Sequence, residues 1–207
     1  MKKIWDISPW VDASSAVFPG DTAYKLEPHF VLGPGCPVNV SRITLSAHTG
    51  AHADAPLHYA NGASAIGALA LEPYLGPCRV VHCIDCGPLI EPEHVARVLG
   101  GLPPRLLVRT LVHARQSWEP FTAFSPATIA LLAAHGVLLV GIDTPSVDPA
   151  SSADLQAHHQ LLHHNLRVLE NLVLDDVPEG DYELIALPLK LAHADASPVR
   201  AILRALN

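Results

Sequence analysis

The stretch that most constrains this chain is residues 48–58, which read HTGAHADAPLH. It sets the side chains of His48, His52, Asp54 and His58 among small residues with little chemistry of their own. Imidazole nitrogens and carboxylate oxygens are the donors that zinc, manganese and related divalent ions prefer, and small neighbours let a backbone fold closely around an ion. The composition therefore predicts a metal site.

The spacing within this stretch favours a structured loop. His48 and His52 stand four apart, as on one helix face, but Gly50 and the turn at Pro56 disfavour a regular helix. In a loop, His48, His52 and Asp54 can converge on one ion and leave a coordination position open, which indicates catalysis. The competing interpretation is surface or hydrogen-bonded core histidines, and three of them beside an aspartate within eleven residues make it the weaker one.

Composition indicates one domain that acts on small molecules. The 207 residues, 49% of them hydrophobic, suffice for one buried core, so we expect a single domain over residues 1–207. A net charge of -7 and the lack of a basic run give no reason to expect nucleic-acid binding. No apolar run approaches the ~20 residues that cross a bilayer, and no signal-peptide core follows the N-terminus. We therefore expect a cytoplasmic protein without membrane contact.

The cysteines agree with a reducing compartment, because four of them at uneven spacing are too few for a secreted disulfide framework. Cys83 and Cys86 form a C-x-x-C pair beside His82, which raises a metal or redox role. No second cysteine pair completes a zinc site, and the pair ends a strand-like run. Ordinary packing is the favoured interpretation.

Short apolar segments alternate with helix candidates along the chain. Strands are predicted at residues 38–47, 79–85, 105–109, 137–143, 166–174 and 182–187. Helices are predicted at residues 93–99, 126–135 and 152–165, with Ser125 and Ser152 as N-caps of the last two. The alternation predicts an α/β domain with a central mixed sheet.

Two later segments carry further candidate ligands. The helix predicted around residues 154–164 has four histidines, of which at least one should face inward. His159 and His163 form the i, i+4 pair of zinc-binding helices, whereas His158 shares a face with leucines, and spacing does not choose between them. Glu170 interrupts an apolar strand; if buried, it needs a cation, hydrogen bonds or a metal. Period-two alternation could instead point it to solvent.

The quoted stretch, continued to Tyr59, resembles the metal-dependent cyclase-like hydrolases and is similar to bacterial kynurenine formamidases in particular. The similarity extends over essentially the whole chain, through WDIS at residues 5–8, FPGD at 18–21, the 158–170 segment, LPLK at 187–190 and DASPVR at 195–200. It implies a swivelling β/β/α-type single domain with a central mixed sheet, assembled as a homodimer.

Carried over position by position, the resemblance implies a two-zinc centre with His48, His52, Asp54, His158 and Glu170 as ligands. Manganese or another divalent ion is the alternative. The resemblance selects His158 because the family's helix histidine lies twelve residues before the strand glutamate, as His158 lies before Glu170. Asp54 and Glu170 would bridge the two ions.

The resemblance also implies a reaction. Kynurenine formamidases hydrolyse N-formyl-L-kynurenine to L-kynurenine and formate in tryptophan degradation. His58 matches their general acid/base, and Phe18 matches a residue, often Trp, that lines the substrate's aromatic group. Trp10 and Tyr59 are further candidates for an aromatic wall, with core packing equally plausible. The alternatives are another amide or lactone hydrolase of the family, such as an isatin hydrolase-like enzyme, and a non-catalytic metal-binding protein.

Overall fold

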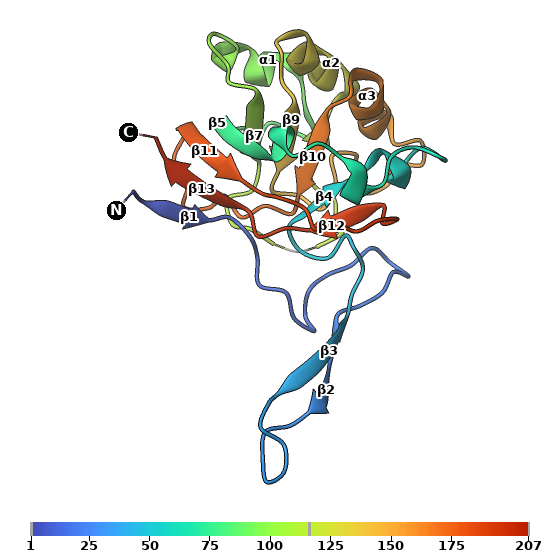
Figure 1. The fold of residues 1–207 in the computed structure, drawn as a ribbon. Helices are drawn as coiled ribbons and strands as arrows, with labels where there is room; N and C mark the ends of the chain where they lie inside the picture. Colours follow the sequence, from blue (N-terminus) through green and yellow to red (C-terminus); the bar gives the residue numbers. More distant parts are fainter. Residues whose placement is uncertain (1, 116, 207) are drawn as a thin grey trace.

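The computed structural model describes residues 2–115 and 117–206, and its centre is a mixed sheet with strand order β1-β13-β11-β5-β7-β9-β10-β4-β12 (Figure 1). The strands are β1 (Ile4–Asp6), β4 (His52–Asp54), β5 (Leu75–His82), β7 (Arg105–Arg109), β9 (Leu139–Ile142), β10 (Arg167–Glu170), β11 (Gly180–Ile185), β12 (Ala196–Pro198) and β13 (Ile202–Ala205). β5, β7, β9 and β10 pair in parallel, and the flanking strands pair antiparallel. The predicted α/β class with a central mixed sheet is confirmed.

The α-helices lie together on one face of this sheet (Figure 1). They are α1 (Pro92–Val95), α2 (Pro126–Ala134) and α3 (Gln156–His164), and the 3-10 turns are η1 (Pro56–His58), η2 (Ile66–Ala68), η3 (Glu72–Tyr74) and η4 (Ala96–Val98). The start predicted for α2 is confirmed, because the Ser125 hydroxyl accepts a hydrogen bond from the Thr128 N–H at 3.2 Å.

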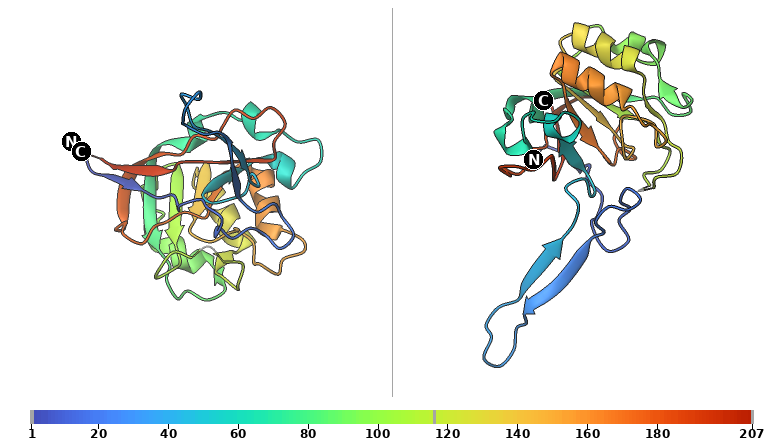
Figure 2. Two further views of the ribbon diagram at one scale, coloured as in Figure 1. Left: turned by 90° about the horizontal axis from the view of Figure 1, so that it is seen from below. Right: turned by 90° about the vertical axis from the view of Figure 1, so that its right-hand side faces the viewer.

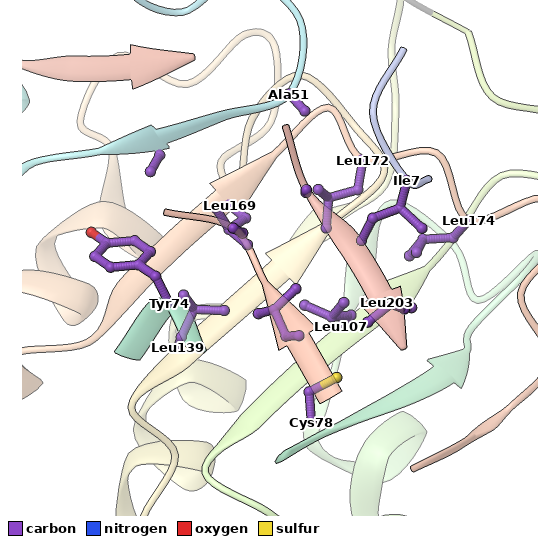
Figure 3. Packing of buried hydrophobic residues seen from close by; sticks show 14 of the residues in the cluster. Ile7, Ala51, Tyr74, Cys78, Leu107, Leu139, Leu169, Leu172, Leu174 and Leu203 are labelled. Atoms are coloured by element: carbon purple, nitrogen blue, oxygen red, sulfur yellow. The ribbon is translucent and has the colours of Figure 1, made fainter. Parts of the chain in front are cut away.

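Side-chain alternation along the strands divides the interior into two cores. In β7, Leu107 points into a core around which the sheet curls (Figure 3), whereas Leu106 points into a core beneath the helices. In β10, Leu169 and Val168 divide in the same way. Because both faces are covered, these strands read as continuous apolar runs.

A hairpin of β2 (Lys25–Phe30) and β3 (Val40–Thr44) projects away from the rest of the molecule as a separate two-stranded sheet (Figures 1 and 2). We call residues 25–44 the arm. The strand predicted at residues 38–47 therefore exists, but it belongs to the arm. A further short pair joins β6 (Leu89–Ile90) to β8 (Ala123–Phe124).

Several predicted boundaries are wrong. The loop expected at residues 48–58 contains strand β4, which pairs on both sides with β10 and β12. The helix expected from Ser152 begins at Gln156, because Leu155 takes a left-handed conformation with φ 45°. The strand expected through residue 174 ends at Glu170, where Asn171 turns the chain with φ 56°.

The two ends of the described chain lie side by side, since β1 pairs with β13 and Ile4 stands opposite Arg204 (Figure 2). Among the described residues, no helix is both long enough and apolar enough to cross a membrane.

Candidate metal centre

Antiparallel pairing of β4 with β10 brings predicted ligands from distant segments together. The register sets His52 opposite Glu170 and Ala53 opposite Leu169. Ala53 and Leu169 point into the core enclosed by the sheet. Because neighbouring side chains alternate, His52, Asp54 and Glu170 point to the other face, where α3 lies.

At that face two carboxylates lie between two imidazoles. The Nε2 atom of His52 is 3.5 Å from Asp54 Oδ1 and 3.2 Å from Glu170 Oε2. The Nε2 atom of His158, on α3, is 3.3 Å from Asp54 Oδ2 and 3.6 Å from Glu170 Oε1. All four residues are buried, with at most 3% of their surface exposed. Glu170 therefore does not face solvent, and among the histidines of α3 it is His158 that faces inward.

A more open group adjoins this cluster. His48 Nδ1 lies 3.0 Å from Asp54 Oδ1. The atoms able to bind a metal fall into two sets that share Asp54, one with His52 and Glu170 and one with His48 and His58. Within each set these atoms lie within 4.8 Å of one another. The arrangement brings all five predicted ligands and His58 to one place.

Three of the histidines present a defined nitrogen to the carboxylates, because the other ring nitrogen has a hydrogen-bond partner. The partners are Gly50 O for His52 Nδ1 (2.9 Å), Asp148 Oδ2 for His158 Nδ1 (2.6 Å) and Asp195 Oδ2 for His48 Nε2 (2.9 Å). Such contacts orient a metal-binding imidazole and select its tautomer.

Asp148 contacts the candidate centre, and the sequence reasoning missed it. Its carboxylate also accepts hydrogen bonds from the N–H groups of Ala157 (2.8 Å) and His158 (3.0 Å), in the first turn of α3. Burial raises the pKa of Asp148, but the contacts with His158 and the backbone outweigh burial and hold that pKa below its usual value. Asp148 thus takes the capping role predicted for Ser152. An isolated aspartate in a loop gave no signal of this.

The electrostatics of the site favour a bound cation. Burial disfavours the charged form of His48, yet Asp54 and Asp195 raise its pKa to about 9. Burial opposes the charged form of His158 too, and Asp148 and Asp54 raise its pKa to about 10. Burial alone would raise the pKa of Asp54, but His158 and His48 hold it well below its usual range.

One buried oxygen supports the same conclusion. Among the described residues, Asp54 Oδ1 has no hydrogen-bond partner, because His48 Nδ1 approaches it outside hydrogen-bond geometry. An unsatisfied buried acceptor costs about 1–3 kcal/mol. A divalent ion would satisfy this oxygen, and the surrounding imidazole and carboxylate donors suit zinc or manganese. The residues present therefore fit a metal.

The cluster opens into a cavity of about 360 Å³. Phe18 lines it, as predicted for the aromatic wall, and packs edge to face on Trp118 with ring centroids 5.0 Å apart. Trp118 is an additional lining residue that no sequence pattern indicated. His58 lines the same cavity with 33% of its side chain exposed.

The other aromatic candidates lie elsewhere. Trp10 lines a separate cavity and is not among the residues that line this one. Tyr59 packs its ring 5.0 Å from the ring of His158 and is not among the lining residues of the cavity. Cys83 and Cys86 are free thiols, and no candidate metal group among the described residues includes a cysteine.

A family model described as "Putative cyclase" matches residues 5–149, and the chain belongs to that family. Its curated relatives carry a narrower name. The kynurenine formamidase of Polaromonas naphthalenivorans (strain CJ2) is 72% identical over 205 residues, covering 99% of this chain and 92% of the relative. That of Bordetella pertussis (strain Tohama I) is 66% identical over 208 residues and 100% of both chains. The resemblance to kynurenine formamidases is confirmed.

Solved structures agree with this fold. A potential metal-dependent hydrolase with cyclase activity superposes with a TM-score of 0.85 at 25% identity and covers 100% of both chains. An isatin hydrolase bound to the product analogue thioisatinate superposes with a TM-score of 0.81 over 99% of this chain and 93% of its own. At 18% identity, the second similarity concerns the fold alone.

Proposed function

We propose that this chain is a metal-dependent arylformamidase that hydrolyses N-formyl-L-kynurenine to L-kynurenine and formate. The observation that carries the proposal is one cavity that contains a buried imidazole and carboxylate cluster, a half-open imidazole and an aromatic wall. The buried cluster suits a metal, the partly exposed imidazole suits proton transfer, and the aromatic wall suits an aryl substrate. The name shared by the two relatives described above supports the choice of substrate.

His48, His52, Asp54, His158 and Glu170 would hold the metal, which we take to be two zinc ions or another divalent pair. Asp54 faces His48 in one candidate set and His52 in the other, which supports two ions; His58, the third member of the first set, is assigned to proton transfer. Metal ions bound there would supply Lewis acidity, which activates water and polarises a carbonyl oxygen. The burial of His52, Asp54, His158 and Glu170 limits the access of competing water to that part of the cluster.

His58 would move the proton. Its Nδ1 lies 3.4 Å from Asp195 Oδ2, so the neutral ring would carry its proton on Nδ1 and present Nε2 as the base. In the hydrolysis, a water oxygen bonds to the formyl carbon as the carbon–nitrogen bond breaks. An arylamine anion is too basic to leave, so the proton that Nε2 takes from water would return to the departing nitrogen.

The aromatic wall would orient the substrate. Phe18 and Trp118 meet edge to face at the cavity surface, a geometry that offers ring faces and edges to a third aromatic ring. With the aryl group on this wall, the formamide can reach toward His58 and the cluster, which line the same cavity.

The arm supports the proposal that the protein is a homodimer. Its exposed apolar side chains are Leu26, Phe30, Val31, Leu32, Val38, Val40 and Ile43. Isolated two-stranded hairpins are marginally stable in water, and a clustered exposed apolar surface indicates a protein partner. We expect light scattering to give twice the chain mass and Phe30→Glu to lower it toward the monomer. A cytoplasmic location, which the free thiols support, completes the proposal.

The test of the activity is hydrolysis of N-formyl-L-kynurenine by the purified chain, followed by absorbance, before chelation, after chelation and after zinc is restored. We expect activity that chelation abolishes and zinc returns, with isatin as a poorer substrate. A metal-loaded protein that hydrolyses isatin and leaves the formamide intact would contradict the proposal. Metal binding without hydrolysis of any amide or lactone would indicate a binding protein instead.

A further inference from the structure

We propose that Asp21 selects substrates in which an ammonium group lies close to the aryl ring, an inference that rests on the proposed function. Asp21 is exposed at the surface of the cavity that contains the candidate metal centre, and it lines that cavity together with Phe18. Asp21 is neither a predicted metal ligand nor a participant in the proposed proton transfer.

A tight turn holds the Asp21 carboxylate beside the aromatic wall. The Asp21 N–H donates to Phe18 O at 2.9 Å, and Gly20 takes φ 93°, the positive value that the third position of such a turn requires. Pro19 occupies the second position, where its ring restricts the backbone. Phe18 and Asp21 therefore stand at the two ends of one β-turn, and both residues line the same cavity.

The Asp21 carboxylate is available to a ligand. Its Oδ1 accepts a hydrogen bond from the Thr22 N–H at 2.6 Å. In the described part of the chain, Oδ2 has no hydrogen bond and no ion-pair partner. The turn thus orients the carboxylate through one oxygen and leaves the other to face the cavity or solvent.

Charge makes this carboxylate selective. Among the described residues that line the cavity, Asp21 and Glu170 are the only acids, and none is a lysine or arginine. Glu170 is buried within the candidate metal cluster, which leaves Asp21 as the charged group at the open, aromatic part. A substrate ammonium would meet an opposite charge here, whereas a substrate carboxylate would meet neither a lysine nor an arginine among the described lining residues.

The proposed substrate matches this arrangement. N-formyl-L-kynurenine carries an α-ammonium and an α-carboxylate on a short chain that is attached through a ketone to the formamide-bearing ring. With the ring on the aromatic wall, the ammonium would lie within reach of the neighbouring carboxylate of Asp21. We infer that the enzyme recognises the amino acid part of its substrate through the ammonium.

The experiment compares two substrates on the zinc-loaded full chain: N-formyl-L-kynurenine and its deamino analogue, 4-(2-formamidophenyl)-4-oxobutanoate. We expect the wild type to favour the first by about fivefold in kcat/KM, the upper end of the scale of an exposed ion pair. Asp21→Asn keeps an oxygen to accept the Thr22 N–H and removes the charge. It should lower kcat/KM for N-formyl-L-kynurenine about fivefold, mainly through KM, and leave the analogue unchanged or improved.

Two further variants make the test specific. Asp21→Glu keeps the charge and should restore part of the preference. Glu119→Gln is the matched control, because Glu119 is an exposed acid next to Trp118 that does not line the cavity. Glu119→Gln should leave kcat/KM unchanged for both substrates.

Equal rates for the two substrates with wild type would overturn the inference, and so would equal losses for both with Asp21→Asn. An effect of Glu119→Gln as large as that of Asp21→Asn would show a general surface charge effect and overturn it as well. If wild type hydrolyses neither formamide, the proposed function fails and the inference fails with it. If the wild type hydrolyses both formamides at equal rates, the proposed function stands and only the inferred role of Asp21 is overturned.

Discussion

The candidate centre has a closed half and an open half built from the same residue types. The closed half is His52, Asp54, His158 and Glu170, each at most 3% exposed. In the open half, the side-chain exposures are 21% for His48, 33% for His58 and 46% for Asp195. Buried charged groups must be compensated by one another or by an ion, whereas partly exposed groups can exchange protons with water and substrate. We expect the closed half, together with the ligand His48, to determine metal retention, and His58 of the open half to determine turnover.

The largest expected effect comes from Asp54, the residue of the closed half that also contacts His48 of the open half. Asp54→Asn removes a charge that His48, His52 and His158 all face within 3.5 Å. We expect bound metal and activity to fall together below detection, as measured by elemental analysis of the purified variant and by the formamide assay. Full metal content in this variant would contradict the assignment of Asp54 as a ligand.

The next effect separates the two halves. We expect His58→Ala to retain its metal and to lose about 10²–10⁴-fold in kcat, the range of a general acid/base. Because the side chain of His58 is one-third exposed, its removal should leave the closed half intact. If His58→Ala loses as much metal as Asp54→Asn does, His58 is a metal ligand, and the separation between metal retention and turnover fails.

A third variant tests how the closed half is held in place. Asp148→Asn replaces one of the two carboxylate oxygens with an NH2 group that cannot accept a hydrogen bond, so the contacts with Ala157 N–H and with His158 cannot all be kept. We expect metal affinity to fall about 10–100-fold, measured by competition with a chelating dye. Asp154→Asn, an exposed acid of the same segment, is the matched control and should bind as wild type does.

The smallest expected effect concerns the backbone that joins the halves. Gly50 has φ 67°, and a Cβ there would lie 2.6 Å from Val11 Cγ2. Gly62 has φ 75° with open space around it. Both alanine substitutions incur about 1–2 kcal/mol of left-handed strain, and Gly50→Ala should lose about 1–3 kcal/mol more through the clash. Urea unfolding of the metal-free variants measures the difference, and equal losses would show that Val11 adapts.

Local chemistry made part of the site predictable. His48, His52, Asp54 and His58 are close in sequence, so their density among small residues was itself a signal. Glu170 was noticeable because a carboxylate in an apolar strand needs compensation. Helical periodicity did not choose His158, because the inward face of α3 depends on where the loop carrying Asp148 caps it. Asp148 and Trp118 reach the site from loops without a distinctive pattern, so sequence offered no sign of them. Asp195 belongs to the DASPVR segment of the family resemblance, but the sequence did not assign it a contact with His48 and His58.

The sequence by itself determined the donor types, the apolar strands of a mixed sheet and the family resemblance, because these depend on composition and on local spacing. Tertiary structure alone decided that residues 52–54 form a strand, that His52 stands opposite Glu170, and that Phe18 and Asp21 reach the same cavity. The reason is that hydrogen-bond register and packing between distant segments arise from the whole chain. A short segment such as β4 has no stable conformation until its neighbours β10 and β12 pair with it.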